Sequence, residues 1–242
     1  MGLKIPEPAL HNPELHKLVF SYLAGRPKGH LLDIPSGPGY LLRELKKIGF
    51  DGIAAEIDPV LHYFKDVNYK KVDMSLNFPF EDNYFDYIVS IEGIEHIENQ
   101  FSFIREVSRV LKTGGEFIIT TPNVHSLESR FKFFLSGFHS LAAKPIPHDT
   151  KNIYFEHINP IDLHYMYFIL KRSGFDIKLL TCPKCRKGSL VLYRLLYPFI
   201  CLSTYISCFS KSERNRNKEL FKLLISKQNL AGSHTVIIAT KK

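Results

Sequence analysis

The sequence predicts an α/β fold in which a mainly parallel sheet carries helices on both faces. Short apolar runs alternate with segments whose apolar residues recur at three- and four-residue spacing, as in repeated strand–helix–strand units. The most informative unit is 30–59, where a strand, a glycine turn, a helix, a second strand and an acid follow one another. That order is typical of one half of a nucleotide-binding sheet.

The individual elements follow from the same spacing. Strands are expected near 30–34, 52–57, 68–73, 85–91, 115–121, 175–181 and 234–240. Helices are expected near 11–24, 39–48, 59–65, 99–112, 124–136 and 160–173. Helices that connect successive strands imply parallel neighbours in the sheet.

The turn after the first strand indicates the kind of ligand. It reads DIPSGPG (33–39), and glycines at 37 and 39 let a ligand approach the backbone where a Cβ atom would clash. Glu56 lies about 20 residues further on, near the end of the second strand, where an acid suits two ribose hydroxyls. Leu42 stands where a dinucleotide-binding motif has its third glycine, so a pyrophosphate cradle is disfavoured. The turn therefore predicts a ligand with a ribose but no phosphate.

Over roughly residues 28–182 the chain resembles the class I S-adenosylmethionine-dependent methyltransferases. The matching motifs, in chain order, are Asp33 with Gly37 and Gly39, VDMSLNFPFEDNYFDYIVSIEGIEHIEN (72–99) and REVSRVLKTGGEFIITTPN (105–123). Pro35 replaces the usual first glycine of the opening motif. The resemblance implies a Rossmann-like seven-stranded sheet whose last strand runs antiparallel between the fifth and the sixth. It also implies S-adenosylmethionine as cofactor and S-adenosylhomocysteine as product.

The resemblance further implies which residues contact the cofactor. Glu56 is the candidate for the ribose diol, because the neighbouring Asp58 precedes Pro59 and reads as a helix cap. For Asp33 and Asp73 the alternative is that each caps the turn after its strand. The implied contacts are Asp33, Ser36, Gly37 and Gly39 at the amino-acid end, Glu56 at the ribose, Asp73 and Met74 at the adenine, and Ile91 and Glu92 near the sulfonium.

Acids and a histidine follow the fourth strand. Glu92, Glu95 and His96 resemble a cluster in ubiquinone-biosynthesis O-methyltransferases and small-RNA 2′-O-methyltransferases. There the cluster holds a divalent metal that polarises the acceptor hydroxyl, and His157 would supply a further ligand here. Mg²⁺, Mn²⁺ or Zn²⁺ would suit these donors. Two alternatives stay open for the catalytic candidates Glu95 and His96: His96 acts as an acid or base without a metal, or the two residues cap the next helix, hydrogen-bond the cofactor or are purely structural.

Two segments are expected to cover the acceptor. Residues 122–140 alternate basic and aromatic side chains, and 148–166 follow them. This stretch resembles bacterial methyltransferases of polysaccharide and cell-envelope pathways, which implies a small-molecule, sugar or lipid-linked acceptor. The alternative is an ordinary amphipathic helix that packs its phenylalanines inward.

The charge of the chain is concentrated near its C-terminus. Residues 1–180 contain 20 Lys and Arg against 22 Asp and Glu, whereas 181–242 contain 12 against 2. Within the basic part, 190–209 are mainly apolar with a single charge, Arg194, and Pro198 interrupts them. We expect 190–227 to meet an anionic membrane surface, the alternatives being a helical cap on the domain or a dimer interface. Two structural units are therefore expected: a methyltransferase domain (1–182 with 231–242) and a helical insertion (183–230).

The sequence favours a cytoplasmic, membrane-associated methyltransferase that acts on a hydroxyl. The beginning of the chain has no apolar run of a secretory signal, and its four cysteines are expected to be reduced thiols. An RNA 2′-O-methyltransferase and a non-catalytic cofactor-binding protein are the alternatives. Nucleic acid is the disfavoured partner, because no base-stacking motif of a known RNA module is present. Neither the acceptor atom nor the oligomeric state follows from the sequence.

Overall fold

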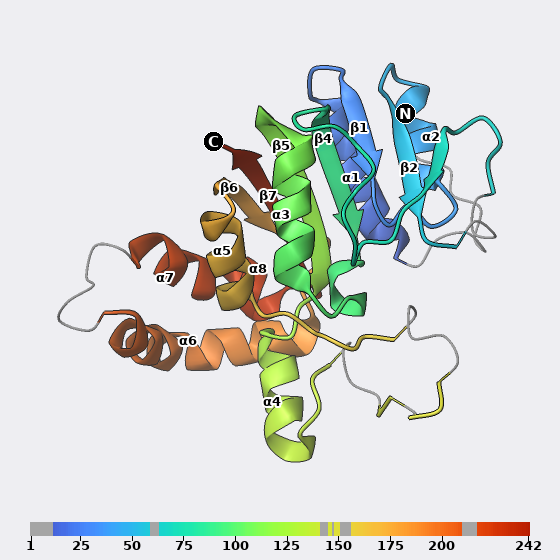
Figure 1. Ribbon diagram of the computed structural model, residues 1–242. Helices are drawn as coiled ribbons and strands as arrows, with labels where there is room; N and C mark the ends of the chain where they lie inside the picture. The colour runs from blue at the N-terminus through green and yellow to red at the C-terminus, as the bar shows by residue number, and fades with distance from the viewer. Residues whose placement is uncertain (1–11, 59–62, 141–144, 147, 151–155, 210–216) are drawn as a thin grey trace.

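A seven-stranded sheet with the order β3-β2-β1-β4-β5-β7-β6 organises the molecule (Figure 1). The computed structural model describes residues 12–58, 63–140, 145–146, 148–150, 156–209 and 217–242. The strands are β1 (His30–Asp33), β2 (Asp51–Glu56), β3 (Tyr69–Lys71), β4 (Phe85–Ile91), β5 (Leu111–Pro122), β6 (Phe175–Thr181) and β7 (His234–Lys241). Neighbours among β1 to β5 are parallel, whereas β7 is antiparallel to both β5 and β6. The expected Rossmann-like sheet, with its last strand between the fifth and sixth, is confirmed.

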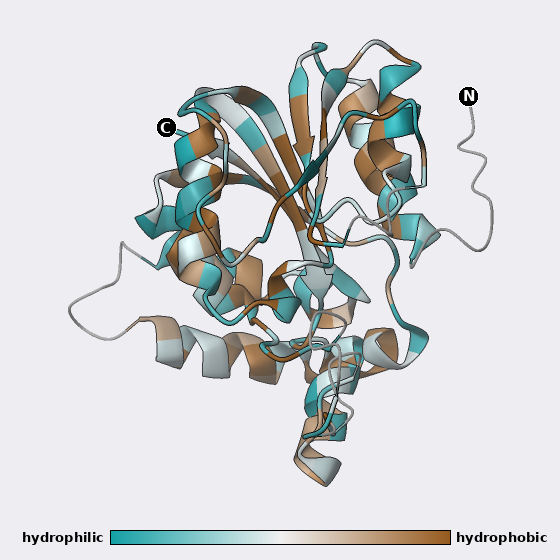
Figure 2. Ribbon diagram, turned by 45° about the vertical axis from the view of Figure 1, so that its right-hand side comes forward, coloured by the Kyte–Doolittle hydropathy of each residue, from teal (hydrophilic) through white to brown (hydrophobic). Residues whose placement is uncertain are grey.

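Helices cover both faces of the sheet and bury two separate cores (Figures 1 and 2). One face packs on α1 (Pro13–Ala24) and α2 (Tyr40–Lys46), and the other on α3 (Gln100–Val110) and α5 (Leu163–Arg172). The helices form where apolar residues recur every three or four positions, so that one face of each is buried. On α3 these residues are Phe103, Ile104, Val107 and Val110, all fully buried.

Two helices begin where a polar side chain caps the first turn, and this shifts their expected starts. The Ser126 side chain accepts from the Ser129 amide and Asp162 from the Tyr165 amide, so α4 (Leu127–Ser136) and α5 each begin three residues later than expected. The helix expected at 59–65 lies largely outside the described residues, and its described part, 63–65, is not helical.

The remaining helices gather at one edge of the sheet. The chain leaves β5 for α4 and leaves β6 for α6 (Lys187–Cys208), and it re-enters the sheet at β7 after α7 (Lys218–Leu224) and α8 (Lys227–Ala231). Pro122 at the end of β5 pairs with His234 at the start of β7, so these helices lie at the carboxyl ends of the parallel strands. Within the described residues, α6 is the one helix long and apolar enough to cross a membrane, judged by length and composition.

Candidate functional site

The loop from β1 to α2 is held open by two glycines and one carboxylate. Gly37 and Gly39 have φ of 50° and 81°, in the left-handed region that favours glycine. A Cβ atom on Gly37 would meet nothing within 4 Å, so the backbone there faces open space. Glu56 accepts from the amides of Gly37 at 2.9 Å and Ile57 at 2.8 Å, and Ser36 donates its amide to the Ala55 carbonyl at 2.9 Å. The expected cofactor residues Ser36, Gly37, Gly39 and Glu56 therefore lie together.

Asp33 lies beneath this loop. Its side chain is buried, and its Oδ2 atom has no hydrogen-bond partner among the described residues. Burial, and secondarily the nearby Glu56, raises the pKa of Asp33 to about 8. Burial likewise raises the pKa of Glu56. Two acids that are costly to ionise thus lie where a ligand with hydroxyl and ammonium donors could satisfy them, and the assignment of Asp33 to the amino-acid end stays a prediction.

The loops after β1, β3 and β4 pack against one another. A Cβ atom on Gly93 would lie 2.3 Å from Cδ of Pro35 and 3.1 Å from Cε of Met74, so only glycine fits there. Pro35, which departs from the family motif, thus fills the space beside a residue without a side chain. Asp73 accepts from the Ser75 amide at 2.8 Å, which is the turn-capping alternative, and its adenine contact stays a prediction.

Glu92 contacts residues from two distant parts of the chain. Its backbone has φ of 49°, and its amide donates to the Thr120 hydroxyl at 3.1 Å. Its carboxylate lies 3.2 Å from Nε2 of His234 and accepts from the side-chain amide of Asn12. Ile91, the other residue expected near the sulfonium, is buried in the core between the sheet and helices α1 and α2.

Sequence reasoning missed Asn12 and His234. Their contact with Glu92 joins the start of α1, the end of β4 and the start of β7, which are far apart in the chain. The sequence did contain a signal for His234. The seventh strand was expected beside the fifth and antiparallel to it, which places residue 234 at the carboxyl ends of the parallel strands.

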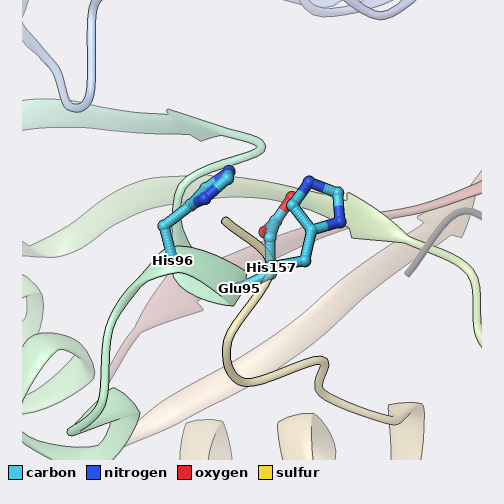
Figure 3. Close-up of side chains that lie close together, drawn as sticks. All are labelled: Glu95, His96 and His157. Atoms are coloured by element: carbon cyan, nitrogen blue, oxygen red, sulfur yellow. The ribbon is translucent and has the colours of Figure 1, made fainter. Parts of the chain in front are cut away.

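Glu95, His96 and His157 form a second group, here called the acid–imidazole cluster (Figure 3). One ligand atom from each lies within 4.8 Å of the others. Glu95 is fully buried, accepts from the Thr121 hydroxyl at 3.1 Å, and has an Oε1 atom without a partner among the described residues. Burial raises the pKa of Glu95 to about 8. The structure thus brings together three of the four candidate metal ligands and leaves Glu92 outside.

The hydrogen bond of His96 determines which of its ring nitrogens is basic. Nδ1 lies 2.9 Å from the carbonyl oxygen of Glu156, and a carbonyl oxygen only accepts, so Nδ1 carries the proton. Nε2 therefore keeps its lone pair in the neutral ring. Burial, followed by the neighbouring His157, lowers the pKa of His96 and keeps the ring neutral at neutral pH.

The cluster has the donor set of a divalent-cation site as well as that of a base. One carboxylate and two imidazoles suit several divalent metals, and a cation would satisfy the unpartnered Oε1 atom of Glu95. The residues present therefore fit a metal, and they equally fit a neutral base beside a protonated acid.

A cavity of about 700 Å³, which we call the α3–α5 pocket, is lined by residues that follow the cluster in the chain, among them Glu98 after His96 and Asn159 after His157. Its wall includes Gln100, whose side chain donates to the carbonyls of Ile94 and Asn159, while the Asn159 amide donates to the Glu95 carbonyl at 3.0 Å. Burial lowers the pKa of His125 to about 4 and also lowers that of His139. The pocket joins the N-terminal ends of α3, α4 and α5, and its lining includes Asn99, His125, His139, Asn159, Asp162 and Tyr165.

Comparison with known proteins places the chain in a family. Residues 11–180 match the model of a methyltransferase domain. A probable S-adenosylmethionine-dependent methyltransferase of Mycolicibacterium smegmatis is 32% identical over 114 residues, which cover 45% of this chain and 44% of the relative. A demethylmenaquinone methyltransferase of Corynebacterium urealyticum is 29% identical over 116 residues, covering 45% and 50%. The chain thus spans about half the length of these relatives.

The fold has solved counterparts. A crystal structure of an S-adenosylmethionine-dependent methyltransferase from Archaeoglobus fulgidus aligns with a TM-score of 0.57 and 21% identity, covering 93% of this chain and 94% of that one. At this identity the likeness concerns the fold.

Proposed function

This chain belongs to the methyltransferase-domain family of class I S-adenosylmethionine-dependent methyltransferases, and from that premise we propose that it methylates a hydroxyl of a small-molecule, sugar or lipid-linked acceptor. The observation that carries the proposal is the His96 ring, which burial keeps neutral and whose Nε2 atom keeps its lone pair. An alcohol is a weak nucleophile at neutral pH, and a base that removes its proton as the bond forms makes methylation feasible.

The residues present fit the cofactor. Gly37 leaves open space, and buried carboxylates at Asp33 and Glu56 can accept from its polar groups. When bound, S-adenosylmethionine supplies a methyl group on a positively charged sulfur. Nε2 of His96 accepts the hydroxyl proton as the acceptor oxygen takes the methyl group. The products are a methyl ether, S-adenosylhomocysteine and a protonated imidazole, which later returns its proton to water.

The lining of the α3–α5 pocket supports a hydroxyl-bearing acceptor that is not anionic, because Glu98 and Asp162 are among its residues. Its volume lies in the range of small-ligand sites. His125 and His139 are neutral at neutral pH because burial lowers their pKa values, so they offer hydrogen bonds rather than charge. The name of one relative, demethylmenaquinone methyltransferase, also supports a small-molecule acceptor.

A metal-assisted reaction is the second candidate, favoured by the geometry of the acid–imidazole cluster. Glu95, His96 and His157 would hold a divalent cation, which would polarise the acceptor hydroxyl. Turnover should then be lost in EDTA and restored by Mg²⁺ or Mn²⁺. Turnover unaffected by EDTA would exclude the metal and leave His96 as the base.

The acceptor can be identified directly. The protein is incubated with a methyl-labelled cofactor and either a lipid or a glycan extract, and labelled products are located by fragmentation mass spectrometry. We expect the label on oxygen. Label on nitrogen or carbon would contradict the proposed hydroxyl acceptor.

A further inference from the structure

Helix α6 exposes a continuous apolar stripe that the fold leaves uncovered. Val191, Leu195, Phe199, Leu202 and Ile206 recur every three or four positions, which places them on one helix face, and each is 57% to 71% exposed. The opposite face packs inward, where Phe209, just after α6, contacts Phe221 of α7 at a ring distance of 5.4 Å and Cys208 is buried. Packing within the described residues therefore does not account for the stripe.

Helix α4 carries a second exposed apolar set at the same edge of the sheet. Phe131, Phe134 and Leu135 lie at helical spacing, Phe138 follows just after the helix, and all four are 42% to 83% exposed. The base of α4 is joined to the first turn of α6, because the Glu128 amide donates to the Ser189 hydroxyl at 3.1 Å. From that base α4 projects away from the sheet (Figures 1 and 2). Together the two sets form what we call the α4–α6 apolar surface.

The charge around this surface indicates an anionic partner. Lys132 on α4 and Lys187 and Arg194 on α6 are exposed. None of these three forms an ion pair with an acid in the described part of the chain. Exposed cations that flank apolar side chains match the anionic headgroups and acyl region of a bilayer. A second copy of this chain would bring like charges together, so charge favours a lipid surface over a dimer.

The geometry indicates a helix that lies on the bilayer and does not cross it. Near the start of α6, the Arg186 amide donates to the Ala231 carbonyl at 2.8 Å, and at its end the Asn217 side chain donates to the Cys208 carbonyl at 2.9 Å. Both ends are thus bonded to the segment that leads back to β7, beside β6. A helix whose two ends return to one sheet stays on one side of a membrane, although its length would suffice to span one.

We propose that the α4–α6 apolar surface inserts into an anionic bilayer surface and turns the α3–α5 pocket toward the headgroups. Val124 and His125, which precede α4, and His139, which follows it, line that pocket, so one helix joins the membrane contact to the acceptor site. Resting on the proposed function, this means that the hydroxyl acceptor is presented by a membrane lipid. The membrane contact itself requires no turnover and is tested separately.

The test is flotation of the full chain with vesicles of phosphatidylcholine containing roughly a third phosphatidylglycerol, compared with pure phosphatidylcholine. We expect binding to the anionic vesicles that weakens with salt, since exposed charges are screened over about 10 Å at 0.1 M salt. The combined variant Leu195→Ser, Phe199→Ser, Leu202→Ser should bind roughly tenfold or more weakly, because the apolar contribution is lost. Phe134→Ser with Leu135→Ser should also weaken binding.

Leu76→Ser with Leu179→Ser is the matched control, because both side chains are exposed and lie outside the α4–α6 apolar surface. It should bind vesicles like the wild type. Equal loss in the control and the α6 variant, or no preference for anionic vesicles, would overturn the proposal. A dimer in sedimentation velocity that is lost in the α6 variant would assign the surface to a second copy and also overturn it. Cofactor affinity, measured by calorimetry on the same samples, shows independently whether the methyltransferase assignment stands.

Discussion

At the carboxyl ends of β1, β2 and β4 the candidate site side chains are buried and bonded to backbone or to neighbouring side chains, whereas α4 and α6 at the same edge leave large apolar side chains exposed. Glu56 accepts from two loop amides, and Glu95 is fully buried. On α4 and α6, by contrast, Phe134 is 83% and Phe199 71% exposed. The cofactor residues are thus held by contacts within the fold, while α4 and α6 present apolar side chains that packing among the described residues leaves uncovered. This contrast suggests that the cofactor is recognised by rigid backbone geometry and that the acceptor is selected through α4 and α6.

The largest expected effect is on kcat and comes from substituting His96, the proposed base. His96→Gln should lower kcat by about 10²- to 10⁴-fold, the usual contribution of a general base, with cofactor affinity unchanged. His164→Gln, at an exposed position on α5, is the control and should leave kcat unchanged. Steady-state kinetics with calorimetry make the comparison. If kcat survives in the His96 variant, the base is elsewhere and the proposed chemistry is wrong.

The pH profile sharpens the same prediction. The pKa of His96 is lowered by burial and by His157, so the neutral base persists below the ordinary range of histidine. The rate should therefore fall about tenfold per pH unit only on the acid side, with its midpoint below about 6.5. A midpoint at or above that value would contradict a buried neutral base.

The next effect concerns the cofactor half alone. Glu56→Ala should weaken S-adenosylmethionine binding by about 1.5–3 kcal/mol, as expected for loss of a charged hydrogen-bond partner. Asp66→Ala is a control, because this exposed acid pairs with Arg43 on α2 and is not among the expected cofactor residues. Calorimetry that shows equal affinities for the two variants would remove Glu56 from the cofactor site. NAD should show no binding to the wild type.

How far the sequence predicts this architecture depends on how local each feature is. The turn at Gly37 and Gly39 and the strand that ends at Glu56 are encoded by neighbouring residues, so pattern and spacing locate them. The direction of Glu92 depends instead on Asn12 and His234, which only the completed sheet brings near. Similarly, α6 is apolar on both faces, so periodicity alone cannot tell which face packs inward and which one Leu195 and Phe199 leave exposed.

The pH dependence of the free energy of unfolding tests whether Glu95 is buried in the folded protein. Its pKa is about 8 in the folded protein against 4.5 for the ordinary side chain, so the folded state binds its proton more tightly. This contribution is fully present below about pH 4.5 and is lost as pH rises toward 8, by at most about 1.4 kcal/mol per pH unit. Glu95→Gln, a neutral mimic, should therefore flatten the fall in free energy of unfolding over that range, with a residual slope from Asp33. Parallel curves for the two proteins in urea titrations would show that Glu95 ionises freely.

The smallest effect is expected on cofactor affinity when the exposed face of α6 is changed, because that face should be independent of the cofactor residues. The variant Leu195→Ser, Phe199→Ser, Leu202→Ser changes side chains that are 61% to 71% exposed, and substitutions at such positions usually alter stability by less than about 0.5 kcal/mol. Since the stripe faces away from the packed side of α6, cofactor affinity in solution should stay within roughly twofold of the wild type. Calorimetry in the absence of lipid measures this directly. A tenfold loss would mean that the outer face of α6 supports the cofactor loops, and the separation into a rigid cofactor half and an outward-facing acceptor half would then fail.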